Sequence, residues 1–169
     1  MRYPSGRMNI AEFTEPEIFR DTNIFIYALA KKHRYKNICE ELLSRINQGE
    51  TIGFTSSTVI NELFHSILIG EVRLKYGDVE IIRFIKEHPN VISECSVAYS
   101  ALDDVFDSSI VILPLTLEVL HHAKTLSKNH NLLFSDAIHA ASCEVYGIKN
   151  IATNDQDFDR VDFLKNWRP

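Results

Sequence analysis

The chain has 169 residues, the length of one compact domain, and carries a formal net charge of −5 with 45% hydrophobic and 24% charged residues. This composition excludes a fibrous or disordered chain. The negative charge means that contact with nucleic acid must use a local basic patch or bound cations. Three widely spaced cysteines, and no apolar run near the ~18 residues of a membrane helix, favour a cytoplasmic protein without membrane contact.

The beginning of the chain differs in character from the rest. Residues 1–14 are polar, contain Pro4 and Gly6, and show no helical or strand periodicity. We therefore expect a flexible N-terminal extension over 1–14 and one domain over 15–169.

Apolar periodicity in that domain predicts short strands alternating with helices. The predicted strands are 18–19, 51–55, 110–113 and 148–153. The predicted helices are 24–29, 34–48, 57–68, 78–87, 97–106, 116–129 and 136–146. This alternation predicts a three-layer α/β/α sandwich with a mainly parallel central sheet. In such sheets, functional residues gather beyond the carboxyl ends of the strands.

Four acidic residues stand at predicted strand ends or in helices with apolar neighbours: Asp21, Glu62, Asp136 and Asp155. A buried carboxylate without a partner is strongly disfavoured. Carboxylates that converge repel one another, and hard divalent cations such as Mg²⁺ or Mn²⁺ relieve that repulsion. Oxygen ligands alone disfavour zinc. The pattern therefore predicts a divalent-cation site.

Each acid also has a purely structural interpretation. Asp21 could cap a helix, Glu62 could form a salt bridge, and Asp136 could be a capping acid in the first turn of a helix. Asp155 could belong to a plain turn.

Four motifs follow one another along the chain: Asp21-Thr22-Asn23 after a strand, Glu62 in an apolar helix, Ser135-Asp136-Ala137-x-x-Ala140-Ala141, and Thr153-x-Asp155-x-Asp157-Phe158. From about Glu17 to Phe163, this ordered set resembles the PIN-domain nucleases, and among them the VapC-type toxins of toxin–antitoxin pairs.

The resemblance implies an endoribonuclease that depends on Mg²⁺ or Mn²⁺ and whose acidic set is Asp21, Glu62, Asp136 and Asp155. Asp157 would be a fifth ligand or a supporting group, so the fourth ligand stays open between Asp155 and Asp157. Asn23, Ser135 and Thr153 would be polar supports of the acids.

The resemblance also implies protein partners. One is a small antitoxin whose tail enters the acidic groove, held by apolar contacts around Ile38, Leu42 and Leu63. The other is a second copy of the chain. A homodimer is favoured further by an apolar stripe after Glu62 that is wider than one helix face needs: Phe64, Ile67, Leu68 and Ile69.

Basic residues follow the first predicted helix, with His33 and Tyr35 between them: Lys31, Lys32, Arg34 and Lys36. They are candidates for contacts with RNA phosphates. The alternative is a solvated start of the next helix.

Other functions compete with a toxin ribonuclease. Glu62-x-x-His65 and Asp136-x-x-His139 resemble the acid-histidine pairs of di-iron bundles, but those need four long helices. The histidines could equally be ordinary packed or partly exposed residues. A PIN-fold nuclease of RNA processing, or a PIN-like scaffold that binds RNA or protein without cutting, are the remaining alternatives.

Overall fold

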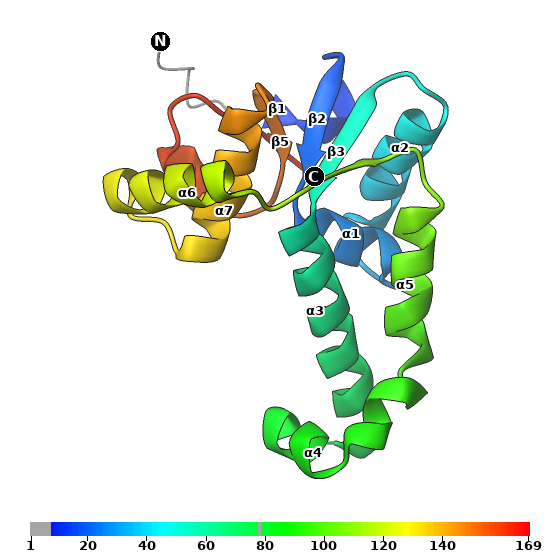
Figure 1. Cartoon of the computed structure of the whole chain (residues 1–169). Helices are drawn as coiled ribbons and strands as arrows, with labels where there is room; N and C mark the ends of the chain where they lie inside the picture. Colours follow the sequence, from blue (N-terminus) through cyan, green and yellow to red (C-terminus); the bar gives the residue numbers. More distant parts are fainter. Residues whose placement is uncertain (1–7, 78) are drawn as a thin grey trace.

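A parallel sheet of six strands forms the centre of the protein (Figure 1). The computed structural model describes residues 8–77 and 79–169. The strands of this part are β1 (Met8–Asn9), β2 (Glu17–Arg20), β3 (Ile52–Ser56), β4 (Val111–Leu113), β5 (Asn150–Ala152) and β6 (Lys165–Arg168), in the spatial order β1-β6-β5-β2-β3-β4. Neighbouring strands all pair in parallel, which confirms the predicted sheet.

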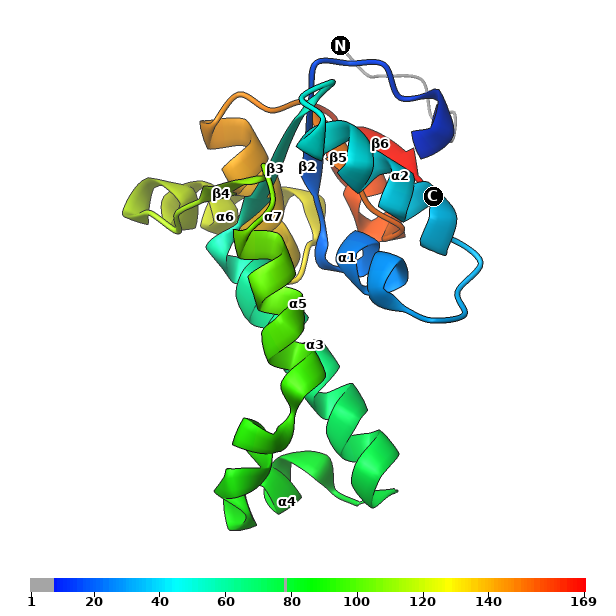
Figure 2. The ribbon, with the colours of Figure 1, turned by 90° about the vertical axis from the view of Figure 1, so that its right-hand side faces the viewer.

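Helices cover both faces of the sheet and confirm the α/β/α sandwich. The helix α1 (Thr22–Leu29) packs with α2 (Lys36–Asn47), and α6 (Leu117–His130) packs with α7 (Phe134–Val145). Figures 1 and 2 show these two pairs on opposite sides of the sheet. Strands covered on both faces are largely buried, and Ile18, Phe19 and Ile151 at the centre of this sheet are fully buried. Within residues 8–77 and 79–169, no helix combines the length and the apolar character that crossing a membrane requires.

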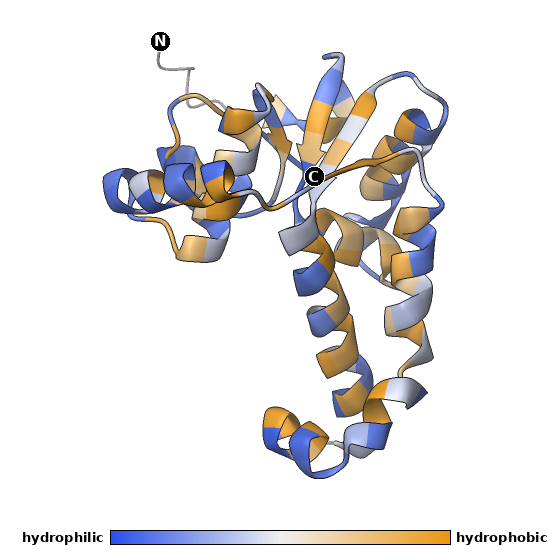
Figure 3. Cartoon of the chain, in the orientation of Figure 1, coloured by the Kyte–Doolittle hydropathy of each residue, from blue (hydrophilic) through white to orange (hydrophobic). Residues whose placement is uncertain are grey.

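A helical arm projects away from the sheet (Figures 1 and 2). It consists of α3 (Ser57–Tyr76) and α5 (Ser96–Phe106), with α4 (Ile81–Glu87) and the 3₁₀ helix η2 (Pro89–Glu94) at its far end. Apolar residues recur along the whole of α3 (Figure 3). The arm has its own hydrophobic cluster of buried residues: Leu68, Val72, Ile81, Val91, Cys95 and Ala98.

The apolar stripe after Glu62 is covered within the chain. Leu68 is buried, and Phe64, Ile67 and Ile69 pack against the cluster of the arm. The ring of Phe64 meets Tyr99 of α5 edge-on, with 5.2 Å between centroids. The stripe therefore does not support a homodimer, because other helices of the arm cover it. The homodimer stays a prediction.

The structure also corrects part of the predicted flexible extension. Met8–Asn9 pairs with β6, and Ile10–Glu12 forms the 3₁₀ helix η1. Ile10 and Phe13 are buried, and Phe13 meets Trp167 edge-on at 4.9 Å between ring centroids. Two apolar anchors are enough to hold this short segment against the edge of the sheet. Residues 1–7 of the predicted extension lie outside the described residues.

Three strand ends meet at one edge of the sheet. Phe19 of β2 lies in register with Phe54 of β3 and with Ile151 of β5. The chain therefore leaves these strands at nearly the same level. Ser56 then caps α3, because its Oγ accepts a hydrogen bond from the Val59 amide at 3.2 Å. Segments that are far apart in the sequence start from this common edge.

Gly53 sets the distance between β3 and α2. A methyl group at this position would meet Cδ1 of the buried Ile46 at 2.6 Å and its Cγ2 at 2.8 Å. We expect Gly53→Ala to lower the free energy of unfolding by about 1–3 kcal/mol, the usual cost of overpacking. Urea denaturation measures this change.

Gly70→Ala in α3 is the matched control. A methyl group there would meet nothing within 4 Å. Alanine should raise the free energy of unfolding by about 0.5–1 kcal/mol, because glycine weakens a helix interior. Equal stability of Gly53→Ala and the parent chain would contradict the close packing of α2 on β3.

Candidate metal centre and active site

Asp21 is the most buried acid of the site, with 6% of its surface exposed. It follows β2 and caps α1, since its Oδ1 accepts a hydrogen bond from the Thr22 amide at 2.7 Å. Its Oδ2 accepts a hydrogen bond from the Thr153 hydroxyl at 2.6 Å and another from the Asn23 side-chain amide. Asp21 therefore does both things that the sequence suggested: it caps helix α1, and it belongs to the group of converging acids. Thr153 and Asn23, the polar supports expected from the sequence, are thus both in contact with this carboxylate.

Glu62 reaches the same place from α3. Its Oε2 accepts a hydrogen bond from the Thr22 hydroxyl at 2.7 Å and lies 3.1 Å from Nε2 of His139. Ligand atoms of Asp21, Glu62 and His139 all lie within 4.8 Å of one another. Three elements, β2, α3 and α7, thus bring two carboxylates and one imidazole together.

His139 was not among the residues that the sequence placed in the site. It lies in α7 with 1% of its surface exposed, and its Nδ1 has no hydrogen-bond partner in the described part of the chain. The interpretation as a packed histidine is correct for its burial but misses its contact with Glu62. The only sequence signal was the spacing Asp136-x-x-His139, which puts both side chains on one helical face.

Asp136 and Asp155 lie near this group but are not among the ligand atoms that come within 4.8 Å of one another. Asp136 lies half-buried in the first turn of α7, and Asp155 caps the 3₁₀ helix η3 (Gln156–Arg160). The Asp155 carboxylate accepts a hydrogen bond from the Asp157 amide at 2.8 Å. The Asp157 carboxylate is paired with Arg160 at 2.7 Å. Of the two candidates for the fourth acid, Asp155 is the one whose carboxylate forms no ion pair among the described residues.

Burial and neighbouring charges shift the pKa values of these acids. Burial raises the pKa of Asp21 above 3.8. Burial and then the charge of Asp155 raise the pKa of Asp136 to about 6. Burial opposes ionisation of Glu62 too, but His139, Thr22 and Ser135 donate hydrogen bonds that lower its pKa below 4.5. Burial lowers the pKa of the His139 imidazole, but the hydrogen bond with Glu62 and the charges of the surrounding acids together raise it above 6.5.

The predicted di-iron alternative is not formed. His65 is exposed on α3, and it is absent from the group of metal-ligating side chains found in the described residues. The parallel sheet also replaces the four-helix bundle that such a centre needs.

The predicted basic group is only partly brought together. Lys36 donates hydrogen bonds to the Ala28 carbonyl at 3.0 Å and to Glu40 at 2.7 Å, so it links α1 to α2. Lys31 and Lys32 are exposed. Arg34 lies over the ring of Tyr35, with 4.4 Å from its guanidinium carbon to the ring centroid.

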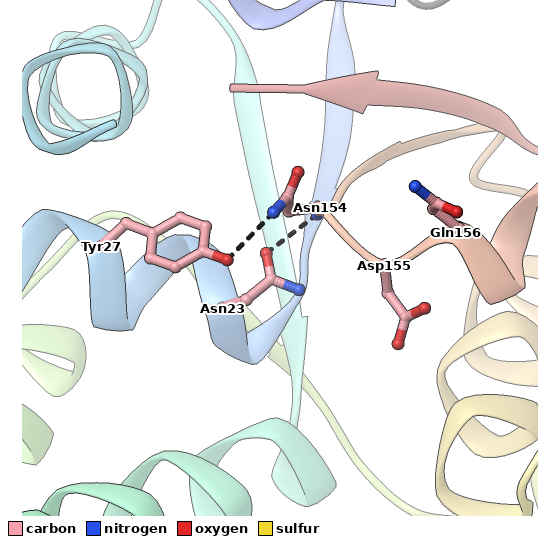
Figure 4. Close-up of a pocket in the computed structure, with 5 residues that line it drawn as sticks. All are labelled: Asn23, Tyr27, Asn154, Asp155 and Gln156. Atoms are coloured by element: carbon pink, nitrogen blue, oxygen red, sulfur yellow. Dashed lines mark hydrogen bonds between the residues drawn. The ribbon is translucent and has the colours of Figure 1, made fainter. Parts of the chain in front are cut away.

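A pocket of about 480 Å³ opens beside the acids (Figure 4). Its lining residues are Asn23, Tyr27, Asn154, Asp155 and Gln156. The side-chain Oδ1 of Asn23 accepts a hydrogen bond from the Asn154 backbone amide at 3.0 Å, and the Asn154 side chain donates to the Tyr27 hydroxyl at 3.2 Å. Polar side chains therefore continue outward from the acidic cluster.

Comparisons with known proteins identify the family to which this fold belongs. A family model described as PIN domain matches residues 18–164. Ribonuclease VapC2 of Methanocaldococcus jannaschii is 31% identical over 160 residues, which cover 94% of this chain and 97% of the relative. Solved structures of similar fold include VapC20 of Mycobacterium tuberculosis, with TM-score 0.61, 17% identity, and coverage of 87% of this chain and 96% of that chain. VapBC2 of Rickettsia felis matches with TM-score 0.59 and 18% identity, over 90% of this chain and 98% of that chain.

A parallel α/β/α sandwich with carboxylates gathered at the carboxyl edge of its sheet is typical of nucleases that work with divalent metal ions. The chain belongs to the PIN-domain family, among the VapC ribonucleases. The resemblance found in the sequence motifs is thereby confirmed.

The charge on Asp136 can be tested directly. In metal-free protein, carbon-13 NMR should show the Asp136 carboxyl titrating at about 6. Folded Asp136 then binds its proton more tightly than the unfolded chain does, so its contribution to stability is present at low pH and is lost as the pH rises from 3.8 to about 6.

Asp155→Asn separates the two causes of this raised pKa. The variant removes the neighbouring charge and keeps the burial, so the pKa of Asp136 should fall but stay above 3.8. An Asp136 that titrates at its ordinary value in the parent chain would contradict this description of the site.

Proposed function

We propose that the chain is a divalent-metal-dependent endoribonuclease that hydrolyses RNA phosphodiester bonds and acts as the toxin of a toxin–antitoxin pair. The observation that carries the proposal is the convergence of Asp21 and Glu62 with His139 within 4.8 Å, flanked by Asp136 and Asp155. Such a site suits a substrate whose phosphate is attacked by water.

The donor set fits a hard cation. Carboxylate oxygens dominate it, and the described residues bring no cysteine to the group. Mg²⁺ and Mn²⁺ prefer such oxygen ligands, whereas sites for zinc combine Cys and His. We therefore assign the metal to Mg²⁺ or Mn²⁺, held by Asp21, Glu62, Asp136 and Asp155. When bound, the cation supplies an activated water at neutral pH and offsets charge on the reacting phosphate.

The residues of the chain orient these acids. The hydrogen bonds from Thr153 and Asn23 fix the Asp21 carboxylate. The hydroxyl of Thr22 fixes Glu62 from the first turn of α1. Loss of a hydrogen bond of this kind around a metal site typically lowers the metal affinity or the activity by about 10–100-fold. The site is thus held ready by neighbours from α1 and from the end of β5.

Two alternative functions share the same fold. A non-catalytic scaffold would not need carboxylates whose geometry is maintained by four hydrogen-bonding side chains, so the site argues against it. A nuclease of RNA processing would use the same acids. The toxin is favoured because, among proteins of similar fold, VapC20 of M. tuberculosis is a sarcin-ricin loop cleaving toxin and a structure from Klebsiella pneumoniae is a toxin–antitoxin complex. The partners proposed here are RNA, a small antitoxin and a second copy of the chain.

Asp21→Asn tests the nuclease. The variant keeps the size of the side chain but removes its charge, so cleavage of single-stranded RNA in Mn²⁺ should fall by at least roughly 100-fold. Chelator should abolish cleavage by the parent chain. Asp104→Asn, on an exposed position of α5, is the matched control and should cleave normally. Activity of clean protein that survives chelator would contradict the metal.

The predicted antitoxin can be tested by competition with metal. A guanidinium of an antitoxin tail can pair with the carboxylates in place of the cation, so excess Mn²⁺ should weaken inhibition. Leu42 and Leu63, expected from the sequence to contact the antitoxin, are buried, so of that set only Ile38 can take part.

The toxin role can be tested by expression in cells. Expression of the chain alone should slow growth, and Asp136→Asn should relieve the effect. A harmless chain that binds no protein encoded beside it would reject the toxin and leave the nuclease.

A further inference from the structure

A second pocket adjoins the one beside the acids. Its volume is about 460 Å³, and its lining includes Arg34, Tyr35, Asp159 and Arg168. Asn154 and Gln156 line both pockets. The two pockets therefore adjoin at Asn154 and Gln156, and together they form a path that is lined by Asp155 in the first pocket and by Arg34 and Arg168 in the second.

The far end of this path contains two arginines, Arg34 and Arg168. Arg34 is exposed, and no ion pair of its guanidinium is found in the described part of the chain. Arg168 is paired with Asp159 at 2.6 Å and has a side chain only 13% exposed. Two guanidinium groups thus face one carboxylate. Arg34 is thus the guanidinium of this pocket that is left to pair with an entering anion.

Flat rings follow the same path. The rings of Tyr27 and His33 stack with 4.1 Å between centroids and an angle of 10°. Tyr35 lies 5.6 Å from Tyr27 and carries Arg34 on its face. Tyr27 lines the first pocket and Tyr35 lines the second. Aromatic and guanidinium planes beside a basic groove are the usual platform for the bases of a single strand.

We propose that the second pocket binds a nucleotide of the RNA strand that flanks the cleaved bond, with its phosphate on Arg34 and Arg168 and its base near Tyr35 and Gln156. This inference rests on the proposed function. RNA is favoured over a protein tail because the path starts beside the acids at which we propose that the phosphodiester bond is hydrolysed. Both arginines and aromatic rings also lie along the path. The pocket is thus a substrate subsite, separate from the metal ligands.

Binding of RNA without cleavage tests the subsite. The probe is a fluorescein-labelled single-stranded RNA dodecamer, measured by fluorescence anisotropy with chains that carry Asp21→Asn. Adding Arg34→Ala should weaken binding by roughly three- to tenfold and should reduce the slope of log affinity against log salt by about 0.7, the value for one phosphate contact on a single strand. Gln156→Ala should weaken binding without changing the slope, because it is neutral.

Lys86→Ala is the matched control. Lys86 is exposed on α4, at the far end of the arm (Figure 1), and its loss should change neither affinity nor slope. Circular dichroism should be the same for all variants, since Arg34 and Gln156 are exposed. An Arg34→Ala chain that binds RNA like the control would overturn the subsite.

Two further outcomes separate the subsite from the proposed function. If the parent chain cleaves the dodecamer in Mn²⁺ while Arg34→Ala leaves binding unchanged, the subsite is rejected and the nuclease stands. If binding depends on Arg34 but the parent chain never cleaves, the subsite stands and the proposed function fails. If Arg34→Ala weakens capture of the antitoxin and not of RNA, the pocket is a protein site and the subsite is rejected.

Discussion

The burial of a charged carboxylate at the end of β2 is the constraint on which the site depends. Asp21 is almost inaccessible to solvent, and burial raises its pKa, so its ionised form needs donors from the protein. Those donors come from the first turn of α1 and, through Thr153, from the chain that follows β5. The register of β2 with β5 is therefore as necessary to the site as the acid itself.

The contact of His139 with Glu62 moderates the same problem of charge. Several carboxylates face one small volume, and each raises the cost of ionising the others. The imidazole donates a hydrogen bond to Glu62 and helps to hold the pKa of that carboxyl below its ordinary value. One acid thus stays charged through a neighbour from α7, whereas Asp136 takes up a proton more readily. The cluster can lose protons when a cation enters.

The sequence predicted the acids and the sheet because both leave local signals. A run such as Ile18–Phe19 marks a buried strand, and Asp21 stands out because it follows that run directly. The role of His139 was not predictable, because a histidine among alanines looks like any packed residue. The apolar stripe that includes Leu68 predicted a dimer surface, although the arm covers it. The sequence could not decide this, because the stripe has the same pattern whether α5 or a second chain packs on it. The strands β1 and β6 were missed because two to four residues carry too little periodicity.

The distribution of charge explains how a chain of net charge −5 can receive a polyanion. Charges in solution interact over roughly 8–10 Å at physiological salt, so the total charge matters less than the charges near each phosphate. The acids repel a phosphate unless a cation lies between them, and this ties substrate binding at Asp21 to metal binding. Farther along the pockets, Arg34 and Arg168 attract a phosphate without any cation. Under the proposed function, a strand is therefore held at one end by the protein alone, while the bond to be cut is held only when the metal is present.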